Sequence, residues 1–465
     1  MTGQARVTRL REASTGAPAV AEAARLTGAD ALLALADLGL PSIAAGPIAR
    51  RKRVVGLLDR WDADARGVRR LQSLRRRFGA GPVEIAIPGR RIVVPLDPGD
   101  VADVLEQSPY PFDPASWEKR RALAQFQPNA VLISRGDIRA KRRQVNEAAL
   151  DAGAELHRLA GPMQAAVDDE AALFAARALD AGTFDSAQFV VAWWRLVRRV
   201  VLGAAARDDD AVTDDLWRLR SAGNWSFLSR PHPRRRERFV ARLYRYAENP
   251  DPNSLLDALA SVPAAGAVDP IGQVPHWLFA FDAAGMAALR AAALLSTHPE
   301  VAADSEIDDP DQVRVRPQLR AAVLESIRLW PTTPAILREI VAPTTWHEGS
   351  AGELTVAPPA TVLIPVPAFH RDPELLPFAD RFAPEVWLDG RAAQHPQLVP
   401  FSAGPAGCPG RDLVLFVTSA LLAALLARLD LTLKSGGPLR PDRPLPATLN
   451  PFGLEFRAAR AAVSA

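Results

Sequence analysis

Helical spacing of apolar positions dominates the chain between residues 97 and 351, where long stretches rich in alanine, leucine and arginine follow one another. Val68, Leu71 and Leu74 have the same spacing within the arginine-rich stretch 66–79, which predicts a solvated surface helix. Residues 277–297 contain no proline and are apolar on all sides, which predicts a buried central helix. The pattern therefore predicts a large helical body.

Another buried helix is predicted after residue 410. Its apolar residues fall on one helical face, and they are Val414, Val417, Leu421, Leu425 and Leu429.

Short strands are predicted in two segments that lie far apart. Residues 82–96 contain two apolar runs joined by a Pro-Gly turn, and residues 352–367 contain a second strand pair. We expect the two segments to form a small sheet, because each is too short to be stable alone. The fold class is therefore mainly α with small β-sheets, built as a single domain over residues 46–465. Residues 1–45 are predicted to be a loosely attached extension.

Composition and charge argue against several classes of protein. The 465 residues carry a formal net charge of only +3, which gives no case for nucleic-acid binding. A single cysteine cannot form an internal disulfide, and the N-terminus does not resemble a signal peptide. The most apolar early stretch, residues 30–49, is broken by Asp37, Gly39 and Pro41, short of the roughly 20 continuous apolar residues of a transmembrane segment. We expect a cytoplasmic protein.

The only cysteine, Cys408, lies in the bare loop "FSAGPAGCPG", residues 401–410. Pro409 suits a first helical position, so the thiol is expected at a helix N-terminus, where thiolate is favoured. Gly404, Gly407 and Gly410 have no side chain to keep a large flat ligand from the backbone. A lone thiolate there suits an iron whose equatorial ligands come from a cofactor, namely haem. The alternative is a small buried hydrophobic cysteine.

Four residues of this loop match a family pattern. Phe401, Gly404, Cys408 and Gly410 fit F-x-x-G-x-x-x-C-x-G, and here the chain resembles the cytochrome P450 superfamily. The resemblance implies a prism-shaped, mainly α fold that binds haem b, with the thiolate of Cys408 as the axial iron ligand.

Two further motifs agree with this resemblance. Glu325 and Arg328 lie three residues apart on a predicted helix, 80 residues before the cysteine, as the structural E-x-x-R pair of the family does. The segment 382–387 resembles the family's F-x-P-x-R-W, but Val386 stands at the arginine position. Arg381 is the nearby candidate to replace that arginine.

The central helix resembles the family helix that crosses the oxygen side of the haem. The usual pattern there is A-G-x-D/E-T, and counting back from "HPEV" places Asp282 at the acid and Ala283 at the threonine. A rival register uses Ala284 and Gly285. The resemblance makes Asp282 and Ala283 the catalytic positions. The structural alternative is that Asp282 merely pairs with an arginine.

Arginines are expected to hold the haem propionates. The resemblance assigns this role to Arg338, on the strand after the E-x-x-R helix, and to Arg142. Ile138 stands where the family has a histidine, and Ala406 stands where a basic residue often precedes the cysteine by two, so two usual propionate partners are missing. Arg139 or Arg143 could compensate, although a solvated helix charge is the favoured interpretation of Arg139.

The resemblance implies a monooxygenase that inserts one oxygen atom from O₂ into a small hydrophobic or amphipathic substrate. Electrons would come from a ferredoxin-type donor with its reductase. The absence of a hydroxyl at Ala283 leaves open a peroxide-driven enzyme or a non-oxygenating rearrangement. The two missing propionate partners and Val386 leave open a haem-binding sensor without turnover. Phe279, Phe281 and Ile336 suggest an apolar pocket.

Overall fold

The computed structural model describes residues 24–461, apart from residues 229, 265, 304–306, 351 and 435–438. Helices form most of it, as the spacing of apolar residues predicted. In chain order they are α1 (Gly28–Leu38), α2 (Leu40–Ala45), α3 (Lys52–Arg60), α4 (Ala63–Phe78), α5 (Pro98–Glu106), α6 (Trp117–Leu123), α7 (Gly136–Ala149), α8 (Ala160–Ala181), α9 (Ser186–Leu202), α10 (Asp210–Gly223), α11 (Pro233–Glu248), α12 (Leu255–Ala260), α13 (Val274–Thr297), α14 (Pro299–Ala303), α15 (Pro317–Leu329), α16 (Val366–His370) and α17 (Arg411–Leu426).

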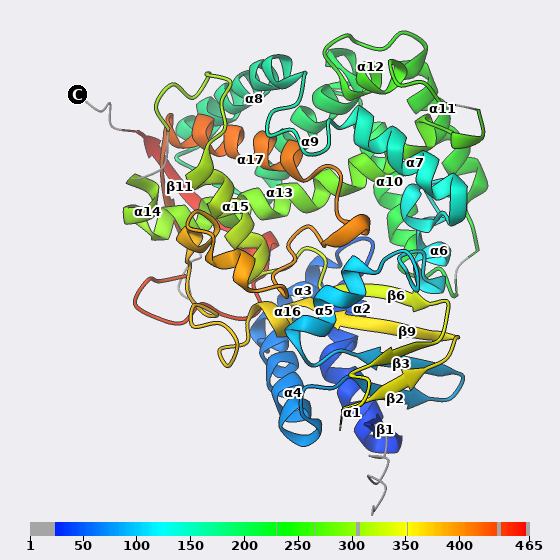
Figure 1. The fold of residues 1–465 in the computed structure, drawn as a ribbon. Coiled ribbons are helices and arrows are strands. Elements are labelled where there is room, and N and C mark those ends of the chain that lie inside the picture. Colours follow the sequence, from blue (N-terminus) through cyan, green and yellow to red (C-terminus); the bar gives the residue numbers. More distant parts are fainter. Residues whose placement is uncertain are drawn as a thin grey trace, which may run out of the picture.

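The strands are β1 (Arg25–Leu26), β2 (Val83–Ile87), β3 (Arg90–Val94), β4 (Phe112–Asp113), β5 (Thr183–Asp185), β6 (Ala335–Ile340), β7 (Thr344–Trp346), β8 (Leu354–Val356), β9 (Ala360–Pro365), β10 (Leu429–Leu433) and β11 (Glu455–Arg460). They form a six-stranded sheet in the order β1-β2-β3-β9-β6-β4, a three-stranded sheet β10-β11-β5 and a pair β7-β8. The six-stranded sheet lies to one side of the helical body (Figure 1).

The sheet joins distant segments, as predicted. β2 and β3 form the expected antiparallel hairpin, and β3 pairs in parallel with β9. The second predicted pair is wrong in one respect, because β8 pairs with β7 while β9 lies between β3 and β6. Pro358 and Pro359 separate β8 from β9, and neither has a backbone N–H to extend a ladder.

Residues 24–45 differ from the loosely attached extension expected for residues 1–45. β1 pairs in parallel with β2, and α1 packs against α4, burying Leu26, Ala31 and Leu38. Gly39 separates two short packed helices, α1 and α2, and Pro41 lies in the first turn of α2, so neither residue marks loose chain. Residues 1–23 lie outside the described part of the chain.

α13 is the central helix that the sequence predicted. It runs through the middle of the helical body (Figure 1), and most of its residues are buried. The helical segment 266–297 is long and apolar enough to cross a membrane, but 72% of its most apolar window is buried inside the protein. Such burial is typical of a core helix.

α17 is more deeply buried than its predicted apolar face suggested. Residues 413–425 are all buried, because the helix packs against α8, α13 and α15. It ends at Leu426, so Leu429 belongs to β10 and not to the helical face assigned to it.

A buried ion pair on α15 connects three parts of the chain. Glu325 and Arg328 are both fully buried, and the Arg328 guanidinium donates to both carboxylate oxygens, with Nη2 2.6 Å from Oε1. Arg328 also donates to the carbonyl oxygens of four residues, and these are His370, Phe378, Ala379 and Arg381. Helix α15 is thereby fixed to α16 and to the segment that leads toward residue 401.

Neutral groups complete the hydrogen bonding of Glu325, because Val386 stands where the family pattern has an arginine. The indole Nε1 of Trp387 and the backbone N–H of Ala383 each donate to the Glu325 carboxylate at 2.9 Å. Val386, at the usual arginine position, is fully buried. The side chain of Arg381 does not replace that arginine: it is exposed and reaches the carbonyl of Pro377, and only its backbone oxygen joins the network.

We predict that Arg328→Met will lower the free energy of unfolding by about 3–5 kcal/mol, because it leaves the Glu325 carboxylate buried without its cation. Arg381→Met is the matched control, and its effect should stay within about 0.5 kcal/mol because that side chain is exposed. Urea unfolding followed by circular dichroism measures both. Equal losses in the two variants would contradict the role assigned to this pair.

Candidate haem-thiolate site

The Cys408 loop is held against the end of α5 by one glycine. Gly404 has a φ of +62°, and a Cβ on it would lie 2.2 Å from the carbonyl oxygen of Leu105. Within the loop, the Gly407 N–H donates to the Gly404 oxygen at 2.8 Å and the Cys408 N–H to the Phe401 oxygen at 3.0 Å. Only glycine permits this approach at position 404, so the loop conformation depends on it.

Cys408 lies close to α17 but not in its first turn. The helix begins at Arg411 with Gly410 as its N-cap, so Pro409 precedes the helix and is not its first residue. Burial raises the pKa of the Cys408 thiol, although a hydrogen bond from the Gly410 backbone and the charge of Arg143 act in the opposite direction. The predicted preference for thiolate is therefore wrong for the protein without iron, because desolvation outweighs the helix end. A coordinating metal reverses this balance.

The same thiol is nevertheless exposed. The sulfur therefore borders space that the protein does not fill, and iron could reach it from there.

One stripe of α13 also borders open space. His276, Phe279, Ala280, Ala283 and Met286 are partly exposed, whereas most other residues of this core helix are buried. Their spacing of three and four residues places them on one face. Burial lowers the pKa of His276 to about 4.

Asp282 lies beside this stripe and forms an ion pair. Its Oδ2 is 2.6 Å from Nη2 of Arg220 on α10, and Arg220 also donates to the carbonyl of Ile48. The structure thus contains the arginine partner that the structural alternative for Asp282 requires. The pair also fixes the carboxylate next to Ala283, whose methyl group can make no hydrogen bond.

Gly285, used by the rival register, lies on the opposite face of α13. A Cβ at this position would be 2.6 Å from the indole ring of Trp193 on α9. The rival glycine therefore packs against a neighbouring helix, and the geometry favours the register that assigns Asp282 and Ala283.

Buried cations gather beside the cysteine loop. Arg338 on β6 donates to Ser108 Oγ at 2.9 Å and to Ser402 Oγ, within the loop, at 3.3 Å. Burial, followed by repulsion from Arg139, lowers its pKa to about 10. Burial and the charge of Arg338 likewise lower the pKa of Lys119. The Nε of Arg139 has no hydrogen-bond partner among the described residues.

Asp113 is the carboxylate that attracts all three of these cations, and Glu147 also attracts Arg139. Asp113 already forms an ion pair with Arg135 at 2.6 Å. Buried cations without matching anions are costly. A ligand with two carboxylates would compensate them, so the residues fit the propionates of haem.

Arg142 is held elsewhere. Its Nε donates to the Val268 oxygen at 3.0 Å and its Nη1 to Ser134 Oγ at 2.7 Å. Of the two arginines predicted to hold the propionates, Arg338 therefore lies at the cysteine loop. Arg142 is bonded instead to Ser134 and to the segment that precedes α13. Arg143 reaches the loop by donating to the Gly407 oxygen at 2.5 Å.

The remaining loop residues have different roles. Phe401 is half-buried and packs against the hydrophobic core that contains α13 and α17 residues. A Cβ on Gly410 would make an ordinary contact of 3.7 Å with Leu150, so space alone does not require glycine there.

Sequence reasoning missed Lys119 and assigned Arg139 to solvent. The only available signal for Lys119 was that lysine is rare in this arginine-rich chain. Arg139 lies in a helix that is basic on several sides, and the pattern does not show which side is buried.

The C-terminal third of the sequence matches a known protein family. The family described as "Cytochrome P450" matches residues 300–454. The cyclooctat-9-en-7-ol 5-monooxygenase of Streptomyces melanosporofaciens is 35% identical over 147 residues, covering 29% of this chain and 31% of that protein. The β-amyrin 24-hydroxylase of Glycine max is 34% identical over 129 residues, covering 26% and 24%. The chain thus aligns with about a third or less of the length of these relatives.

Solved structures extend the likeness to most of the fold. A cytochrome P450 named CYP102L1 superposes with a TM-score of 0.66 at 19% identity, covering 85% of this chain and 94% of that one. The retinoic acid-bound cyanobacterial CYP120A1 gives 0.65 at 17% identity, covering 84% and 93%. The chain therefore has the fold of the cytochrome P450 haem domains, and its residues 300–454 match the cytochrome P450 family.

Proposed function

We propose that this protein is a haem-thiolate monooxygenase that inserts one oxygen atom from O₂ into a small hydrophobic or amphipathic molecule. Haem b bound through a cysteine thiolate is the general feature of the superfamily. The observation that carries the proposal is the accessible thiol of Cys408 on its glycine-dependent loop, bordered by buried cations that lack matching anions.

In this proposal the chain's own residues hold the cofactor and handle protons. Cys408 would bind the haem iron through its sulfur, and a bound haem thiolate would supply the chemistry that splits O₂. Arg338 carries one propionate, with Arg139 and Lys119 beside it, and Arg142 remains a candidate for the other. A redox partner delivers electrons, and we propose a ferredoxin-type donor with its reductase and a cytoplasmic location.

Proton delivery is the step in which this chain departs from the usual pattern. Asp282, fixed by Arg220, is the acid nearest to Ala283 along the stripe of α13. Because Ala283 has no hydroxyl, we propose that an ordered water or a substrate hydroxyl relays the proton from the Asp282 carboxyl. Because Ala283 has no hydroxyl, a second candidate function is a peroxide-driven enzyme or one that catalyses a non-oxygenating rearrangement.

Cys408→Ser tests the central assignment. The purified wild-type protein should be red and, when reduced under carbon monoxide, should show the Soret shift typical of a thiolate ligand. The variant should lose that shift because a hydroxyl replaces the sulfur. A colourless wild-type protein that takes up no haem would end the proposal.

Arg338→Ala and Arg142→Ala, each alone, should weaken haem retention by about ten- to a hundredfold, since a charge-assisted hydrogen bond contributes about 1.5–3 kcal/mol. Arg139→Ala tests the substitute that the structure suggests. Transfer of haem to apomyoglobin measures retention, and Arg76→Ala on the exposed face of α4 is the control. If both Arg338→Ala and Arg142→Ala retain haem normally, other residues hold the propionates.

Asp282→Asn should slow product formation by about a hundredfold, because an acid in proton transfer contributes at least that much. Ala283→Thr should raise the product formed per electron consumed with poorly fitting substrates, and it should reduce leaked peroxide. Haem content and thermal unfolding are measured alongside, so that loss of the Arg220 ion pair is not mistaken for lost chemistry. Normal turnover in Asp282→Asn with unchanged peroxide leakage in Ala283→Thr would refute this proton route.

A further inference from the structure

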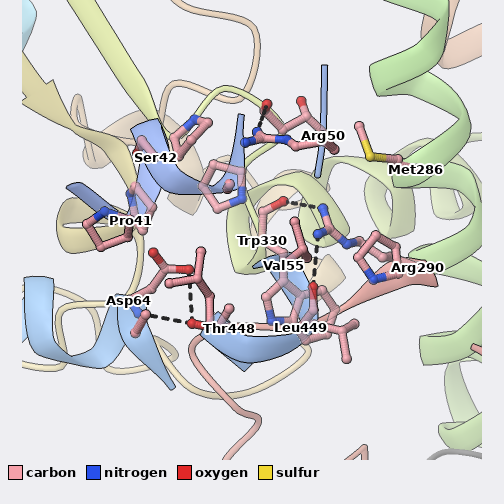
Figure 2. A pocket seen from close by; sticks show the side chains of 18 of the residues that line it. Pro41, Ser42, Arg50, Val55, Asp64, Met286, Arg290, Trp330, Thr448 and Leu449 are labelled. Carbon is pink, nitrogen blue, oxygen red and sulfur yellow. Dashed lines mark hydrogen bonds between the residues drawn. The ribbon is translucent and has the colours of Figure 1, made fainter. Parts of the chain in front are cut away.

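A pocket separate from the cysteine loop lies between α2, α3 and α13. Its cavity volume is about 70 Å³, and it is partly open to solvent. Figure 2 shows Arg50, Asp64 and Arg290 around this pocket, each from a different element. No step of the proposed oxygenase chemistry uses these three charges.

Both arginines in the pocket are bonded only to neutral groups. Arg290 is 8% exposed, and it donates from Nη1 to the Trp330 oxygen at 2.9 Å and from Nη2 to the Leu449 oxygen at 3.1 Å. Its Nε has no partner among the described residues. Arg50 donates to the Thr332 oxygen at 2.7 Å. In the described chain, neither guanidinium has a carboxylate within ion-pair distance.

The nearby acids compensate these cations only in part. Burial lowers the pKa of Arg290 to about 9, and repulsion from Arg50 adds to it, although Asp64 and Asp59 attract Arg290. Burial also raises the pKa of Asp64 to about 6, despite the attraction of Arg371 and Arg50 and a hydrogen bond from Thr448. Since both guanidinium groups bond directly only to carbonyl oxygens, each lacks a directly paired anion.

The rest of the wall is mostly apolar. Hydrocarbon surface comes from Val55, Met286, Trp330, Leu449 and Phe452. A site with apolar walls and a buried cationic end suits an amphiphilic acid, whose carboxylate meets guanidinium groups and whose chain replaces water along the walls.

We propose that this pocket binds an organic carboxylate, with the carboxylate group between Arg50 and Arg290 and the hydrocarbon part along the apolar wall. The proposal concerns binding alone, so it stands or falls independently of oxygenase activity. Met286 also belongs to the exposed stripe of α13, one helical turn beyond Ala283, so the ligand would border the proposed haem site.

Octanoate, 1-octanol and acetate are the probes, titrated calorimetrically into the purified full-length, haem-containing protein. Octanoate should bind at least about tenfold more tightly than 1-octanol, because only the acid meets the guanidinium groups. It should also exceed acetate by about tenfold or more, because acetate lacks the chain that contacts the walls. Equal binding of octanoate and 1-octanol would overturn the proposal, and equal binding of acetate and octanoate would overturn the assigned ligand class.

Variants locate the site. Ser42→Phe on α2 fills the pocket without changing a charge and should abolish octanoate binding, whereas Ile43→Phe, on the exposed side of the same helix, should leave it unchanged. Arg50→Gln should weaken octanoate binding by about tenfold, and Asp64→Asn should strengthen it by removing the competing anion. Arg290→Gln is added if it folds. Unchanged octanoate affinity in Ser42→Phe or in Arg50→Gln would refute the site.

Discussion

The buried pair of Glu325 and Arg328 is the interaction on which the position of the cysteine loop depends. A guanidinium has a fixed set of donors in one plane, and here they reach a carboxylate and four backbone carbonyls at once. The carbonyls belong to α16 and to residues 378–381, which precede the loop. A lysine could not make this set of bonds, because its ammonium is a single point with three donors. The chain beneath the cysteine is thus positioned by one side chain.

The surroundings of the Glu325–Arg328 pair and those of Cys408 differ in how their charges are paired. Around Glu325 and Arg328 every polar group described has a partner, and Trp387 supplies a neutral donor where the family pattern has a cation. Around Cys408, Arg338 and Lys119 are bonded to neutral hydroxyl and carbonyl groups, and Asp113 attracts both of them as well as Arg139. The proposed haem would add its two carboxylates beside these cations.

Much of this arrangement could be predicted from the sequence, because it is encoded locally. The glycine and cysteine spacing of residues 401–410, the apolar run of α13 and the β2–β3 hairpin are all patterns of neighbouring residues. The contacts between side chains from distant segments could not be predicted in the same way. Nothing in the segment around Arg139 shows that it faces Arg338, and the F-x-P-x-R-W likeness does not reveal that Trp387 bonds to Glu325. The thiol pKa also depends on how much protein surrounds the sulfur, which local sequence does not record.

The parallel pairing of β3 with β9 has a consequence for the time course of biosynthesis. Ile92 pairs with Thr361, 269 positions later in the chain, and β9 also separates β3 from β6. At about 5–20 residues per second, a ribosome needs roughly 15–50 s to add that stretch. For this interval the edge of the β2–β3 hairpin has no strand to cover it, and unpaired apolar edges are where nascent chains associate wrongly. The centre of the sheet is therefore completed only after β9 has been synthesised.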